Sequence, residues 1–120
     1  MESPTFEISQ NEKIFKIKHK DLNYNLSISS DSEKIKLLLK SESPNNFFFF
    51  EEIYTLKKLS KINNIFLAFD SIKMIRNSIE DTISNNKFSI KDNYGYIGII
   101  LKVPLFQKLV DINLVLNKKI

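Results

Sequence analysis

The 120-residue sequence contains no cysteine and only one histidine, His19, and two glycines, Gly95 and Gly98. Without cysteine the chain cannot form disulfides, cysteine-ligated zinc sites, iron–sulfur clusters or a thiol nucleophile. A single histidine excludes a multi-histidine metal site, and two glycines are too few for a glycine-rich phosphate loop. We therefore expect no cofactor and no metal ion.

Long hydrophobic runs are also absent. The longest, Tyr96 to Leu101, contains a glycine and is far shorter than the roughly 20 apolar residues that span a bilayer. No apolar signal-peptide segment follows Met1. We therefore expect an intracellular protein, cytoplasmic or cytoskeletal, without membrane contact.

The residues that are present describe an ordinary globular chain, with 42% hydrophobic and 27% charged residues. The length suits a single domain over residues 1–120. Lysine outnumbers arginine 17 to 1, and 18 isoleucines and 13 asparagines complete a bias that is typical of an AT-rich genome. Much of the lysine and asparagine content therefore reflects this bias more than a specific chemistry.

Alternation of apolar and polar residues predicts a meander of strands in the first third of the chain. The clearest strand is 22–29, where Leu22, Tyr24, Leu26 and Ile28 share one face and asparagines and serines share the other. This pattern predicts a sheet with one dry and one wet side. The same alternation predicts further strands at 5–9, 13–19 and 34–40.

Four consecutive phenylalanines, Phe47–Phe50, follow a loop that contains Pro44. Aromatic runs of this kind favour a strand that is buried on both faces, near the centre of the core. The alternative is an exposed strand edge, which would form a partner surface.

The hydrophobic period then changes to three or four residues, which predicts a helical insert over 55–85. Thr55 and Asp70-Ser71 are expected to cap two helices at their N-termini. The second helix carries an isoleucine stripe, and Asn85-Asn86 ends it. Its polar residues do not resemble a DNA-recognition helix, because it has only one arginine and several acidic neighbours.

Strand patterns resume over 87–116. Asp92 to Gly95 predicts a hairpin turn, and the apolar strand 96–103 is expected to end at Pro104. With strands over 5–50 before the insert, the fold class is α+β. We expect an antiparallel curled β-sandwich or half-open barrel with a two-helix insert.

Candidate catalytic groups are few. His19 stands in a lysine-rich strand, so a structural or surface role is expected for it. The adjacent carboxylates Glu51/Glu52 would point to opposite faces of a strand, and Glu80/Asp81 would splay around a helix. We expect a protein that is not an enzyme.

The net charge of +4 leaves a nucleic-acid-binding alternative open. Its basic face would comprise Lys16, Lys18, Lys20, Lys34 and Lys36. Aromatic rings that could stack on bases are expected on the opposite, apolar face, which disfavours single-strand binding. A carrier with an apolar ligand is disfavoured because the many large side chains predict a filled interior.

Residues 55–116 resemble the globular head of the centriolar cartwheel protein family, whose superfamily includes scaffolds of DNA end-joining. The similarity lies in the order of a short helix through Phe66-Leu67-Ala68-Phe69-Asp70, the isoleucine-striped helix, and the segment Phe88 to Val103. The resemblance implies a curled β-sandwich and a non-enzymatic, cytoskeletal role in which heads pair. It also implies a bulky apolar residue at the tip of the last hairpin that enters a partner pocket, and Tyr94 matches this position.

We therefore expect a non-catalytic protein–protein interaction or assembly domain, binding itself or another protein. Its candidate contact residues are Tyr94 at the hairpin tip and Leu105 and Phe106, two apolar residues in an expected loop after Pro104. An exposed turn tyrosine and a loop that folds back over the core are the structural alternatives.

Overall fold

The computed structural model describes residues 11–43, 48–105 and 108–119. Seven antiparallel strands form a single sheet in the order β1-β2-β3-β4-β7-β6-β5. The strands are β1 Lys13–His19, β2 Leu22–Ser30, β3 Lys34–Ser41, β4 Phe49–Thr55, β5 Phe88–Asn93, β6 Tyr96–Leu105 and β7 Lys108–Lys119. Between β4 and β5 lie α2 Leu56–Ile62, the 3₁₀ helix η1 Asn64–Ala68 and α3 Ile72–Ser84.

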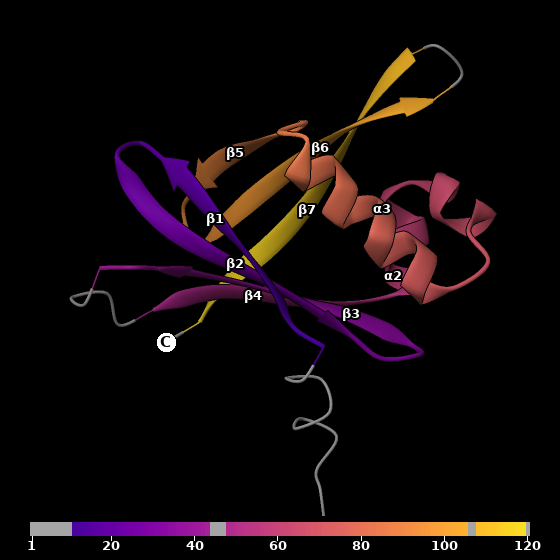
Figure 1. The fold of residues 1–120 in the computed structure, drawn as a ribbon, viewed down its shortest axis with the longest axis horizontal. Coiled ribbons are helices and arrows are strands. Elements are labelled where there is room, and N and C mark those ends of the chain that lie inside the picture. Colours follow the sequence, from indigo (N-terminus) through magenta and orange to yellow (C-terminus); the bar gives the residue numbers. More distant parts are fainter. Residues whose placement is uncertain (1–10, 44–47, 106–107, 120) are drawn as a thin grey trace, which may run out of the picture.

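The sheet curls into a nearly closed barrel with a helical side (Figure 1). β4 and β7 pair over only three residue pairs, from Phe49↔Lys119 to Glu51↔Asn117, and then diverge. The helices lie in the opening between the two halves of the sheet (Figure 1). This arrangement confirms the expected α+β fold with its two-helix insert.

One hydrophobic core joins the concave face of the sheet to the helices. The apolar residues predicted to face inward in β2 and β3 are buried except Leu22, with Leu26, Ile28, Ile35 and Leu37 at most 1% exposed. Leu22, at the start of β2, is 45% exposed. The helical side contributes Leu59, Phe66 and the four isoleucines of α3 (Ile72, Ile75, Ile79 and Ile83).

The predicted capping residues are confirmed. The Thr55 hydroxyl accepts a hydrogen bond from the Lys58 N–H, and the Ser71 hydroxyl accepts one from the Met74 N–H. Asn86, just past α3, has a φ of 57°, in the left-handed region that asparagine tolerates at a helix end.

The exposed-edge alternative is wrong for Phe49 and Phe50, because β4 lies between β3 and β7. The expectation of burial on both faces holds only in part: Phe50 is buried, whereas Phe48 and Phe49 are half-buried. The strand also runs on to Thr55, where Tyr54 is 2% exposed. Phe47 and the predicted strand 5–9 lie outside the described residues.

Two further expectations need correction. β6 does not stop at Pro104 but continues to Leu105, because beyond Lys102 only β7 pairs with it and the missing proline N–H breaks no ladder to β5. The polar face of β2 is not uniformly wet either. Ser27 is 9% and Ser29 is 4% exposed, since these short side chains lie between longer neighbours on β1 and β3.

Candidate interaction surface

Tyr94 lies at the tip of a tight hairpin turn between β5 and β6. Asn93 pairs with Tyr96, so Tyr94 and Gly95 form a two-residue loop. Gly95 has a φ of +86°, a value that only glycine adopts readily, as at the third position of a type II turn. The Tyr94 side chain is 104% exposed and is the most exposed large hydrophobic residue among those described.

The turn that carries Tyr94 is hydrogen-bonded to the C-terminal strand, β7. The Lys118 N–H donates a hydrogen bond of 3.0 Å to the Gly95 carbonyl. The Lys118 ammonium lies 4.2 Å from the centroid of the Phe48 ring, which in turn meets Phe50 edge to face. Tyr94 therefore projects from a turn that these contacts hold in place. Binding of its side chain to a partner would cost little loop entropy.

The last hairpin is formed by β6 and β7, not by β5 and β6. Tyr94 therefore lies at the turn of the hairpin that precedes the last one, and its role as a contact residue stays a prediction. Leu105 ends β6, paired in register with Lys108, so it belongs to a strand and not to the expected loop. Phe106 lies outside the described residues.

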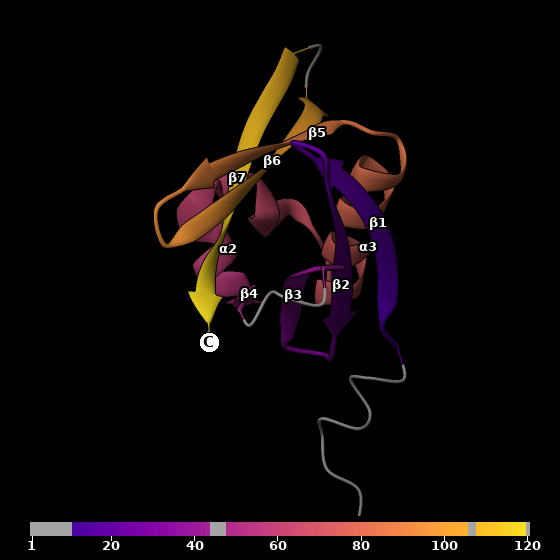
Figure 2. The same ribbon diagram turned by 90° about the vertical axis from the view of Figure 1, so that its left-hand side faces the viewer.

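The β6–β7 ribbon extends beyond the body of the sheet (Figures 1 and 2). Val103 pairs with Val110 and Pro104 pairs with Leu109, in a stretch where neither β5 nor β4 continues the ladder. Leu109 is 65% exposed. The outer edges of this two-stranded ribbon have no partner strand among the described residues. Such edges, together with an exposed leucine, form a surface that proteins commonly protect or use for binding.

A groove of about 580 Å³ lies where this ribbon meets the helices. Its apolar lining comes from η1 and the segment that follows it, from α3 and from β6, and comprises Ile65, Phe69, Met74, Val103 and Pro104. Asp81, Lys87 and Lys102 are among its polar margin. A mostly apolar floor with a few charged groups at the rim is typical of a site that receives a bulky side chain.

The proposed basic face is largely neutralised. Lys16 pairs with Glu42 at 2.9 Å, Lys20 with Asp92 at 2.9 Å and Lys36 with Glu51 at 3.3 Å. For Lys18 and Lys34 the described part of the chain offers no ion pair. These ion pairs leave fewer free positive charges for phosphate binding than the sequence alone indicates.

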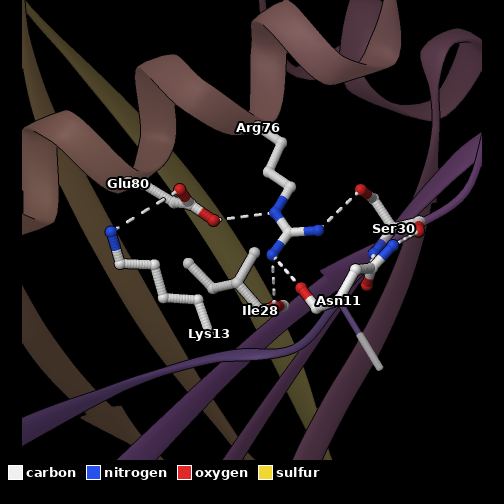
Figure 3. A network of polar contacts seen from close by, with 6 residues as sticks. All are labelled: Asn11, Lys13, Ile28, Ser30, Arg76 and Glu80. Carbon is white, nitrogen blue, oxygen red and sulfur yellow. Dashed lines mark hydrogen bonds and ion pairs between the residues drawn. The ribbon is translucent and has the colours of Figure 1, made fainter. Parts of the chain in front are cut away.

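The carboxylate pairs are also separated, as expected. Glu51 pairs with Lys36, whereas Glu52 pairs with Lys58 at 2.7 Å. Glu80 belongs to a buried network around Arg76, the only arginine of the chain (Figure 3). Over the described ranges 11–43, 48–105 and 108–119, no group of three or more histidine or acidic side chains could hold a metal ion.

The Arg76 network anchors α3 to the first two strands (Figure 3). The guanidinium donates to Glu80 at 2.7 Å, to the Ser30 hydroxyl at 3.0 Å and to the Ile28 carbonyl at 3.1 Å, and it also contacts the Asn11 carbonyl. Arginine can satisfy four acceptors at once because its donors form a planar fork. The network therefore has a structural role.

His19 is part of a cluster that sequence reasoning did not identify. Its Nε2 atom lies 2.9 Å from Oδ2 of Asp92, which the Lys20 ammonium also contacts at 2.9 Å. These positive and hydrogen-bonding neighbours hold the pKa of Asp92 below its usual range, Lys20 contributing most. Because His19 and Asp92 are 73 positions apart, no local spacing signals their contact.

In the described part of the chain, no helix is both long and apolar enough to cross a lipid bilayer.

No protein-family model matches the sequence, and no curated protein sequence matches it. The fold, however, is similar to the crystal structure of the head domain of human CCDC61, with a TM-score of 0.69 over 90% of this chain and 96% of that chain. The two sequences are only 6% identical, so this likeness concerns the fold alone. It confirms the predicted resemblance to a head domain and extends it from residues 55–116 to most of the chain.

Proposed function

We propose that this chain is a non-catalytic assembly domain that binds a second copy of itself through its apolar hairpin ends. The observation that carries the proposal is the complete exposure of Tyr94 on a turn that is hydrogen-bonded to β7. A rigid aromatic side chain that is accessible without loss of loop entropy is the type of residue that dominates interface energies. The fold likeness to a head domain supports the same function.

The groove beside the β6–β7 ribbon supplies a receptor of suitable chemistry. Its apolar lining, which includes Phe69 and Met74, suits the ring of Tyr94 from a second copy. Tyr94 and Leu105 lie near opposite ends of β6, so the domain has two candidate contact ends. Reciprocal contacts of one end would give a closed dimer, whereas contacts between different ends would give an open chain of heads.

The experiment is sedimentation velocity over a wide concentration range, with Tyr94→Glu and Phe106→Glu measured separately. We expect Tyr94→Glu to weaken self-association about 30-fold, the loss expected for a central anchor. The melting temperature should not change, because the Tyr94 side chain makes no contribution to the core. The matched control is Leu67→Glu, which places the same charge on another exposed apolar position, 61% exposed on η1.

Self-association that is lost only in Phe106→Glu would move the anchor to the last hairpin. Sedimentation that does not depend on concentration in the unaltered chain would contradict self-assembly altogether.

A further inference from the structure

The two edge strands of the sheet approach each other without forming a backbone ladder. β1 and β5 are the first and last strands of the sheet order, and the strand pairings of the described residues contain none between them. The curl of the sheet nevertheless brings the β1–β2 turn up to β5 (Figure 2). Here the side chains of His19 and Lys20 contact Asp92 of β5, and we call these three residues the edge clasp.

At the end of the two edge strands away from the clasp, helix α3 covers the space between the sheet edges. There α3 lies against β2 and β6, and Glu80 of α3 reaches Lys13 at the start of β1 at 4.0 Å. The edge clasp therefore closes the end that the helix does not cover. Its side chains are accessible to solvent protons, since the His19 side chain is 18% and that of Asp92 is 38% exposed.

Composition makes the clasp unusual within this protein. Histidine is the side-chain type whose charge ordinarily changes between pH 5 and 8. The chain has one histidine, His19, and no cysteine, and this histidine belongs to the edge clasp. The other charged or titratable groups brought to the cluster are Asp92 from β5, Lys20 from the turn and Tyr24 from β2. Burial raises the pKa of Tyr24, and hydrogen bonds from Lys20 and His19 lower the pKa of Asp92. Tyr24 therefore stays neutral and Asp92 stays negatively charged between pH 5 and 8.

We propose that the edge clasp is a pH-responsive latch that holds the two sheet edges together in mild acid and loosens them toward pH 8. Protonation gives the imidazole a full positive charge beside the Asp92 carboxylate, which strengthens their hydrogen bond. Lys20 opposes this charge, but its side chain is 72% exposed and well screened by water.

Amide hydrogen exchange of β1 and β5, measured on dilute monomer at pH 5.5 and pH 8 and corrected for intrinsic rates, tests the latch. We expect protection to be about two- to fivefold greater at pH 5.5, as for an ion pair that is partly exposed. His19→Gln removes the titration and should give equal protection at both pH values. Asp92→Asn keeps the imidazole but removes its partner, and should also give equal protection.

The matched control is Asp111→Asn, which removes a carboxylate paired with Lys102 at 3.4 Å on the β6–β7 ribbon. It should retain the full pH response of the unaltered protein. Equal protection at the two pH values in the unaltered protein would overturn the proposal, and so would a pH response that survives in His19→Gln or Asp92→Asn. Because these readings come from the monomer, they do not depend on the proposed self-assembly.

Discussion

Arg76 shows how much one residue can do in a chain that otherwise uses lysine. Its side chain is 11% exposed and it connects α3 with β2 and with the start of β1. The acceptors include two backbone carbonyls, of Ile28 and Asn11, that would lose this donor without the guanidinium. A buried acceptor without a partner destabilises the fold more than a surface ion pair stabilises it.

We expect Arg76→Lys to lower the free energy of unfolding by roughly 1–3 kcal/mol. A lysine ammonium carries the same charge but cannot reach acceptors on three sides. Urea denaturation would measure the loss as a lower midpoint with an unchanged slope. Lys73→Arg, the reverse exchange at an exposed position of the same helix, is the control and should change stability little. Equal stability of Arg76→Lys and the unaltered protein would contradict this role.

At the scale of elements, α3 is the part of the fold on which the packing of both sheet halves depends. It contacts β2 and β3 on one side and β6 on the other. Its four buried isoleucines recur at three- and four-residue spacing, so a single stripe faces the core. Loss of packing here should therefore affect both halves together.

We expect Ile79→Ala to destabilise the protein by about 2–5 kcal/mol, because it leaves a cavity at a residue that is 3% exposed. Met74→Ala shortens an apolar side chain on the same helix, but Met74 is 46% exposed, and its effect should stay within about 0.5 kcal/mol. Thermal unfolding of the two variants would distinguish these values. A loss of similar size in both would contradict the assignment of the effect to core packing at Ile79, since alanine is the best helix former and helix propensity cannot lower stability in either variant.

Sequence patterns predicted the elements whose hydrophobic period was unambiguous. β2, β3 and α3 fall where alternation or the isoleucine stripe placed them, since burial of one face fixes the period. The first helical segment was less regular than expected. Asn63 ends α2 and begins η1, and its side chain accepts a hydrogen bond from the Ile65 N–H, so local capping competes with a continuous helix.

The remaining features could not be predicted because they depend on which strands become neighbours. The interior position of β4 follows from its pairing with β7, a strand that begins more than 50 residues later. The continuation of β6 through Pro104 depends on where β5 stops. At the candidate site, the exposure of Tyr94 agrees with turn chemistry that the sequence shows, whereas the groove and the edge clasp arise from tertiary contacts alone.

At the scale of the whole molecule, Tyr54 joins the two halves of the sheet where β4 and β7 diverge. Its hydroxyl donates a 2.6 Å hydrogen bond to the Val115 carbonyl, two positions before Asn117, where the β4–β7 pairing ends. Burial raises the pKa of Tyr54 well above its usual value, with a smaller contribution from the charge of Glu52. The folded state therefore keeps this hydroxyl neutral under conditions in which the unfolded chain ionises it.

The difference in the pKa of Tyr54 between the folded and the unfolded chain determines how stability changes at alkaline pH. A folded pKa that is raised above the unfolded value of about 10 contributes stability fully present below pH 10 and lost as the pH rises further. At pH 7 we expect Tyr54→Phe to cost about 1 kcal/mol, because the Val115 carbonyl loses its donor. Between pH 10 and 11 the gap to the unaltered protein should shrink by about 1 kcal/mol, since phenylalanine cannot ionise when the chain unfolds.

Urea denaturation of both proteins at pH 7, 10 and 11 measures the difference in their free energy of unfolding at each pH. The titration of the 17 lysines cancels in this difference, because both proteins share them. A constant gap for Tyr54→Phe would mean that the hydroxyl ionises as readily in the folded as in the unfolded chain. The junction would then be wet, and the closure of the two halves would depend on the α2 and α3 packing alone.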